Sequence, residues 1–165
     1  MNETGNTAEW RASSPPSCQL RRSLVARAAN HTCALNLEHV IEILRPLPVE
    51  GVAGAPETVL GLSVIRGAPV PVVALAALFN APGGASTRFV IVRTGDKRIA
   101  LAVDAVVGIR EFAENAYQAL PPLFRDAAAR AVETIGELDS ELFFVLKTAA
   151  LVPAELWESL TEEER

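Results

Sequence analysis

The chain has 165 residues, of which 50% are apolar, so one domain of ordinary size can bury its core without metal or disulfide support. The formal net charge is −5, with 20 acidic side chains against 15 Lys and Arg, and this argues against a surface that neutralises nucleic-acid phosphates. Two cysteines make no disulfide framework and residues 1–20 contain no apolar signal segment, so we expect reduced thiols and a cytoplasmic protein.

The two ends of the chain differ in composition from the middle. Residues 1–20 are polar, contain Pro15-Pro16 and show no periodicity, a pattern typical of a flexible tail, and residues 161–165 form a charged C-terminal end. The most apolar stretch, residues 59–79, contains Arg66 together with several prolines and glycines, which favour strands and a turn over a membrane-spanning helix. We therefore expect one folded domain over residues 21–160, without membrane insertion.

Short, alternating apolar segments follow one another through this domain, and ten are predicted as strands. In chain order they cover residues 24–29, 32–37, 40–44, 62–65, 70–75, 88–94, 98–103, 106–109, 132–138 and 142–146. Turns are predicted at Asn30-His31, Gly67-Ala68, Gly95-Asp96-Lys97 and Asp139-Ser140. Short helices are predicted at residues 74–79, 122–131 and 153–160. The chain is therefore expected to be all-β.

An internal repeat organises these strands. Residues 24–43 (LVARAANHTCALNLEHVIEI) align without a gap with residues 90–109 (VIVRTGDKRIALAVDAVVGI), and residues 65–78 align more weakly with residues 138–151. The halves, about residues 23–79 and 89–151, would each hold about five strands, too few for a well-buried core, so we expect them to pack together and to close into small barrels. Chance similarity between two alternating hairpins is the competing explanation.

The sequence contains no recognisable catalytic or metal-binding motif. His31 and His39 lack neighbours at metal-ligand spacing, and HExxH, GxSxG and GxGxxG are absent, so we predict a protein that is not an enzyme and needs no metal or cofactor. Glu42 lies in an apolar strand and Arg66 ends another, and two such charges invite mutual pairing because an isolated charge there is costly. Two separately solvated side chains are the alternative at this stage.

Residues 59–75 (VLGLSVIRGAPVPVVAL) resemble the signature of CheW-like domains, the coupling proteins of bacterial chemotaxis, which reads approximately GVxNLRGxxVPVxDL. The matching residues are Gly61, Arg66, Gly67, Val70, Pro71, Val72 and Leu75. The resemblance extends over about residues 22–158, through CALNLEHVIEILR and RIALAVDAVVGI. The chain departs from the pattern at Ser63-Val64, where the family has x-Asn, and at Ala74, where it has Asp.

The resemblance implies a fold of two intertwined, five-stranded, SH3-like β-barrels related by pseudo-symmetry, with short helices and a C-terminal helix. It implies a non-catalytic adaptor that couples the cytoplasmic tip of a chemoreceptor to the regulatory domain of a CheA-like histidine kinase, in membrane-associated receptor arrays. Glu42 and Arg66 match a facing pair near the receptor groove of the family. The complete set of predicted partner-binding residues is Val40, Glu42, Gly61, Leu62, Val64, Arg66 and Gly67.

Two alternatives remain beside the adaptor. A diverged inhibitor, or decoy, would occupy a kinase or receptor without coupling them, in a pathway that controls motility, pili or development. A small-ligand sensor or enzyme would use a cleft between the barrels.

Overall fold

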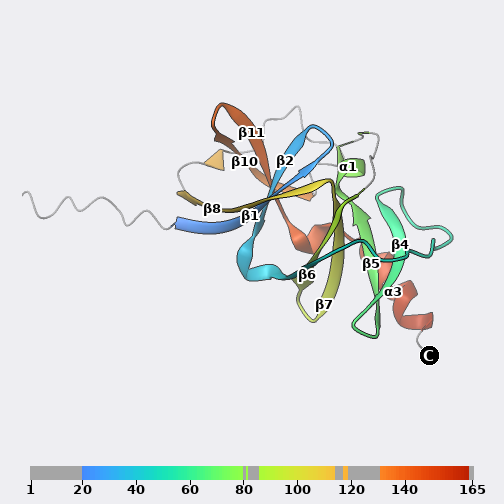
Figure 1. Ribbon diagram of the computed structural model, residues 1–165. Helices are drawn as coiled ribbons and strands as arrows, with labels where there is room; N and C mark the ends of the chain where they lie inside the picture. The colour runs from blue at the N-terminus through green and yellow to red at the C-terminus, as the bar shows by residue number, and fades with distance from the viewer. Residues whose placement is uncertain (1–19, 80, 82–85, 114–116, 119–130, 164–165) are drawn as a thin grey trace, which may run out of the picture.

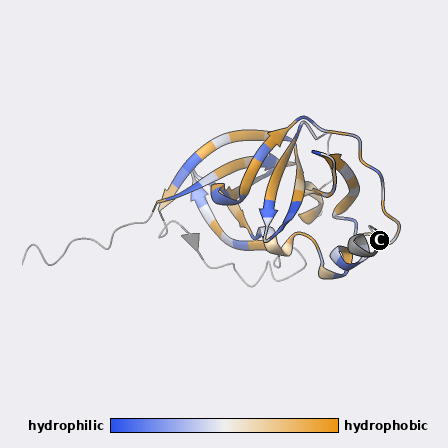
Figure 2. Cartoon of the chain, turned by 90° about the horizontal axis from the view of Figure 1, so that it is seen from below, coloured by the Kyte–Doolittle hydropathy of each residue, from blue (hydrophilic) through white to orange (hydrophobic). Residues whose placement is uncertain are grey.

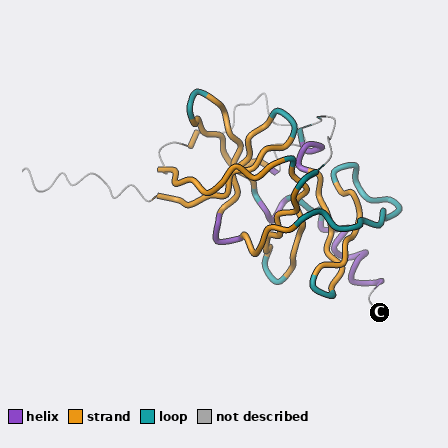
Figure 3. Tube along the Cα trace, viewed as in Figure 1, coloured by secondary structure: helices purple, strands orange, loops and turns teal. Residues whose placement is uncertain are grey.

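The computed structural model describes residues 20–79, 81, 86–113, 117–118 and 131–163 (Figure 1). Strands dominate it, joined by tight turns and a few short helical segments (Figure 3). The strands are β1 (Leu20–Ala28), β2 (His31–Asn36), β3 (Val40–Leu44), β4 (Val59–Ile65), β5 (Ala68–Ala74), β6 (Arg88–Thr94), β7 (Lys97–Val103), β8 (Ala105–Ala113), β9 (Tyr117–Gln118), β10 (Val132–Leu138) and β11 (Glu141–Leu146). The helical segments are η2 (Leu37–His39), α1 (Leu75–Leu78), η5 (Thr148–Ala150) and α3 (Ala154–Glu163). All ten predicted strands are present, and the all-β prediction is confirmed.

Two predictions fall wholly or largely outside the described residues. These are the flexible tail over residues 1–20, of which only Leu20 is described, and the helix over residues 122–131, of which only Ala131 is described. The helices predicted at residues 74–79 and 153–160 are confirmed as α1 and α3. Within the described residues, no helix combines the length and the apolar character needed to cross a membrane.

The strands form two sheets that share one plan. The first sheet has the order β8-β1-β2-β11-β10-β9 and the second has the order β3-β6-β7-β5-β4. Each sheet takes strands from both halves of the sequence repeat, so the two units are intertwined. Replacing every strand of the second sheet by its counterpart in the repeat gives β8-β1-β2-β11-β10, which is the order of the first sheet without β9. We call the first sheet unit A and the second unit B.

The strand registers repeat as well as the strand order. Leu24 lies opposite Leu35 in β1·β2, and Val90 lies opposite Leu101 in β6·β7, 66 residues further along. The bulge of β8 against β1 recurs in β3 against β6, and the β4·β5 register recurs in β10·β11 at an offset of 73 residues. A register shift by one residue would turn each side chain to the opposite face, so equal registers mean equal inward-facing positions. The two units are therefore related by pseudo-symmetry.

Unit A has one strand more than predicted because of a short edge pairing. Gln118 of β9 lies opposite Ile135 of β10, and the equivalent contact in unit B is an isolated bridge between Glu50 and Leu62. A segment thus pairs with the edge strand at the equivalent place in both units, as a two-residue strand in unit A and as a single bridge in unit B.

Apolar side chains form three clusters. The largest lies between the units and combines residues of both sheets, including Leu24 and Leu35 of unit A with Val90 and Leu101 of unit B. Two smaller clusters, one around Phe89 and one around Phe143, fill the individual units. Figure 2 shows the apolar character running along the strands of both sheets. Because the shared cluster is the largest, each unit depends on the other for most of its burial.

Two of the predicted turns are displaced by one residue, and a third is one residue shorter than predicted. The turns lie at Ala29-Asn30, at Arg66-Gly67 and at Gly95-Asp96, so His31, Ala68 and Lys97 already belong to strands. A two-residue hairpin of this kind needs positive φ at its first central position, and Ala29 and Arg66 both adopt a φ of 54°. The strand pairing on either side fixes this conformation although neither residue favours it. The turn at Asp139-Ser140 is confirmed.

Candidate protein-binding surface

Glu42 and Arg66 form a bidentate ion pair. Arg66 donates from Nε to Glu42 Oε1 at 3.2 Å and from Nη2 to Oε2 at 2.7 Å. The Arg66 side chain is 64% exposed and that of Glu42 is 21% exposed, so the pair is open to solvent. The mutual pairing predicted from the sequence is confirmed, and the alternative of two separately solvated charges is wrong.

The pair joins the two edges of unit B. Glu42 lies on edge strand β3, and Arg66 begins the turn that follows the opposite edge strand, β4. Because the two edge strands are at opposite ends of the strand order, this ion pair requires the sheet to curl. The edges must come close enough for the Arg66 side chain to reach from one to the other. Gly67 completes the turn with a φ of 79°, a conformation that a glycine adopts without steric cost. The geometry therefore presents the guanidinium at the tip of a hairpin.

The pair also sets the ionisation of both groups. The hydrogen bond from Arg66 holds the pKa of Glu42 below its ordinary value, helped by the charges of Arg66 and Arg98 and opposed by desolvation. The hydrogen bond and the charge of Glu42 raise the pKa of Arg66. Both groups are consequently charged near neutral pH, and the surface presents a fixed anion beside a fixed cation.

Gly61 has a structural role in the same strand. Its φ is 145°, and a Cβ at this position would lie 2.0 Å from the carbonyl oxygen of Glu50. That close approach lets Glu50 and Leu62 exchange two backbone hydrogen bonds of 2.8 Å each. The loop between β3 and β4 is thereby fastened to the exposed edge of β4. Sequence reasoning assigned Gly61 to partner contact, whereas the geometry makes it the residue that lets this loop close over the edge.

Exposed apolar side chains lie on the two edge strands that the ion pair joins. On β4, Val64 is 69% exposed and Leu60 is 46% exposed, with half-buried Leu62 between them. On β3, Ile41 and Ile43 are exposed on either side of Glu42. Grouped apolar side chains of this kind mark interaction sites on soluble proteins.

Sequence reasoning missed three of these side chains and misjudged the setting of a fourth. It did not single out Ile41, Ile43 or Leu60, because the continuous apolar run VIEIL hides which of its two faces meets solvent. Val40, which it did select, is half-buried and packs against the central core cluster. The structure thus brings Glu42 and Arg66 into contact and turns Val64 outward, but it places Val40 largely inside.

Unit A has an apolar counterpart without the ion pair. Val107 and Ile109 of β8, the equivalents of Ile41 and Ile43, are also exposed. At an offset of 66 residues the equivalent of Glu42 is Gly108. The edge strands β3 and β8 are therefore alike in their exposed apolar side chains, and they differ in charge.

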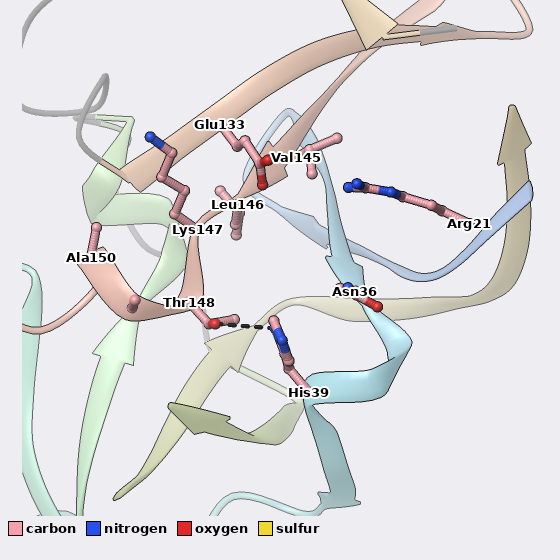
Figure 4. A pocket seen from close by; sticks show the side chains of 10 residues that line it. Arg21, Asn36, His39, Glu133, Val145, Leu146, Lys147, Thr148 and Ala150 are labelled. Atoms are coloured by element: carbon pink, nitrogen blue, oxygen red, sulfur yellow. Dashed lines mark hydrogen bonds between the residues drawn. The ribbon is translucent and has the colours of Figure 1, made fainter. Parts of the chain in front are cut away.

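A groove of about 340 Å³ lies beside η2 and η5 (Figure 4). Val145, Leu146 and the alanines of η5 supply its apolar part, and Arg21, Glu133 and Lys147 are among its polar side chains. His39 Nδ1 lies 3.3 Å from Thr148 Oγ1, which links the segment that leads into β3 to the segment that leads into α3. Within the described residues, no group of three His, Cys, Asp or Glu side chains could hold a metal ion.

A curled, intertwined pair of sheets with apolar side chains around a fixed ion pair defines a β-rich interaction module. The family model of the CheW-like domain matches residues 22–156, and the chain belongs to this family. Its members are non-catalytic scaffolds that act in chemotaxis coupling, which agrees with the prediction that the chain is not an enzyme.

One solved structure illustrates the fold. The scaffolding protein TtCheW from Thermoanaerobacter tengcongensis is similar with a TM-score of 0.71 and 24% sequence identity, over 81% of this chain and 92% of that chain. No curated protein matches the chain significantly.

Proposed function

We propose that this protein is an adaptor that couples the cytoplasmic tip of a chemoreceptor to the regulatory domain of a CheA-like histidine kinase. It would act in the cytoplasm, recruited to membrane-associated receptor arrays. The observation that supports this most strongly is the Glu42–Arg66 pair, which bridges two edge strands of unit B that carry exposed apolar side chains. Family membership supplies the class of partner.

The chemistry of the surface suits a polypeptide partner. Apolar side chains such as Val64 and Leu60 supply area that is removed from water on association, and the charges around them fix orientation and speed encounter. Because the Glu42 carboxylate is already satisfied by Arg66, a partner that covers the pair leaves no unpaired charge. Leu62 and Gly67 hold the strand and turn that carry these groups. Partner contact is thus proposed for Glu42, Leu62, Val64, Arg66 and Gly67, and an indirect role for Val40 and Gly61.

The test compares two substitutions that reverse the charge of an arginine. Arg66→Glu places two carboxylates together, and we expect at least one of the two affinities, for the kinase domain or for the receptor tip, to fall about tenfold or more, which corresponds to about 1.4 kcal/mol. Arg22→Glu is the matched control, because Arg22 also belongs to an exposed ion pair, with Glu111 at 3.9 Å, but lies in unit A. Titration calorimetry with folded variants measures both. If Arg66→Glu bound both partners with unchanged affinity, the assignment of this surface as a partner-binding site would be wrong.

A decoy is the second candidate, and the position of Val64 favours it. The family pattern has Asn there, and this chain instead exposes 69% of a valine on the proposed contact surface. Ala74, where the family has Asp, leaves the first turn of α1 without a side-chain cap. A decoy would bind one partner and lower the activity of a reconstituted receptor–kinase assembly, whereas a coupling adaptor would raise it.

A further inference from the structure

Two arginines face each other on the β6–β7 hairpin. Arg93 lies directly opposite Arg98 in the antiparallel pair, and both side chains are exposed. Like charges directly opposite each other destabilise a strand pair. Within the described part of the chain neither arginine belongs to an ion pair, and Asp96 at the hairpin tip is paired with neither of them. The hairpin therefore carries an electrostatic cost that no ion pair of the described residues relieves.

This arginine pair lies beside the Glu42–Arg66 pair. Side chains two residues apart on a strand share a face, so Arg93 is on the same face as Ile91, and Ile91 lies opposite Glu42. The tips of the β4–β5 and β6–β7 hairpins both point to the lower side of the view in Figure 1. Arg98 is close enough for its charge to act on Glu42. Arg66 and Arg98 thus both act on one carboxylate at this end of unit B, and Arg93 lies on the strand next to it.

Unit A shows how the fold balances charge at the same place. The equivalents of Arg93 and Arg98 are Arg27 and Thr32, so unit A has a single arginine here. Arg27 Nη2 lies 3.5 Å from Oε2 of Glu141. The residue equivalent to Glu141 in unit B, 73 positions earlier, is Ala68. The β6–β7 hairpin therefore has one arginine more than the β1–β2 hairpin, and unit B lacks an equivalent of the Glu141 carboxylate.

We propose that Arg93 and Arg98 form a docking site for a carboxylate-rich segment of a partner polypeptide, next to the Glu42–Arg66 pair. The proposal rests on the adaptor function, because the partner is one of the two named there. An acidic segment supplies the charge that the hairpin lacks, and because the formal net charge of the chain is −5, the attraction depends on the local patch and not on the overall charge. An anionic membrane surface is a poorer fit, since lipid-binding patches gather about four to eight basic residues.

The test uses substitutions taken from the other unit. Arg98→Thr installs the residue that stands at the equivalent position of unit A, Arg93→Thr removes the second arginine, and Arg27→Thr is the matched control. Stopped-flow association with the kinase domain and with the receptor tip is measured at about 50 mM and about 300 mM salt. We expect Arg98→Thr and Arg93→Thr each to lower the association rate with one partner about three- to tenfold at low salt, and much less at high salt. Arg27→Thr should leave both rates unchanged, and Arg98→Thr should keep or raise the melting temperature.

Three results would overturn the proposal. Association rates of Arg98→Thr and Arg93→Thr equal to those of the unsubstituted protein would do so, and so would losses that are independent of salt. Binding to vesicles rich in phosphatidylserine that is lost in the same variants, with partner association intact, would assign the patch to membranes. If the unsubstituted protein bound neither partner, the adaptor function would fail as well, so the two failures are distinguishable.

Discussion

Replacement of Gly61 by alanine tests the most constrained contact in the structure. A Cβ there would lie 2.0 Å from the Glu50 carbonyl oxygen, on a backbone with a φ of 145°. Non-glycine residues in such conformations cost about 1–3 kcal/mol. Separation of the loop from the strand breaks two hydrogen bonds, each contributing about 0.5–1.5 kcal/mol. Because strain and separation relieve each other in part, we expect a loss of about 2–4 kcal/mol of unfolding free energy.

The assay is thermal and denaturant unfolding followed by circular dichroism, with Gly51→Ala as the control. A loss of this size corresponds to a melting temperature lower by about 5–15 °C for a chain of this length. Gly51 has open space around its Cβ position, and its φ lies outside the range that strains other residues, so its replacement should change stability by less than about 0.5 kcal/mol. If Gly61→Ala were as stable as Gly51→Ala, the contact between the β3–β4 loop and β4 would not exist as described.

Three further predictions concern charge, burial and turn conformation. The stability difference between the unsubstituted protein and Glu42→Gln should be fully present above the ordinary Glu pKa and should disappear as pH falls through the lowered pKa of Glu42; a difference that persisted in strong acid would refute the ion pair as its cause. Burial raises the pKa of the Cys33 thiol to about 12, so in a Cys18→Ser background iodoacetamide at pH about 8 should label Cys33 only after unfolding, and rapid labelling of the folded protein would contradict its burial. Asp104 Oδ2 accepts a hydrogen bond from the backbone N–H of Ala29 at 2.7 Å, so Asp104→Ala should lower the unfolding free energy by about 1–2 kcal/mol in thermal unfolding. Ala29→Gly relieves a φ of 54° and should leave the unfolding free energy unchanged or raise it by up to about 1 kcal/mol. Effects of the opposite sign would refute this interpretation of the turn.

The repeat was predicted from the sequence, and in the structure it extends to the register of the paired strands. The two offsets, 66 and 73 residues, match the strand registers pair by pair. Short, alternating apolar segments bounded by turn residues are enough to locate ten strands, because at least one face of each must be buried. The exchange of strands between units came from the family resemblance alone, since alternation within a strand carries no information about which unit it joins.

Strand ends and turns were harder to predict for a physical reason. β8 continues to Ala113 because Arg22 pairs across the sheet with Glu111, and this charged extension shows no apolar alternation. Arg66 occupies a positive-φ turn position that residue preference would leave to glycine. In both places tertiary pairing overrides local preference. For the site, charge in an apolar setting left two separately solvated side chains as an alternative, and the family resemblance favoured the Glu42–Arg66 pair. The role of Gly61 needed the position of the Glu50 carbonyl.

The coupling function is tested most directly by reconstitution of a membrane-bound receptor, a CheA-like kinase and this protein, with kinase autophosphorylation as the readout. The account predicts that addition of the protein produces a receptor–kinase assembly and raises autophosphorylation, and that Arg66→Glu abolishes most of the increase while Arg22→Glu retains it. Kinase activity that stays at its receptor-free level, with no assembly recovered at any protein concentration, would contradict the account.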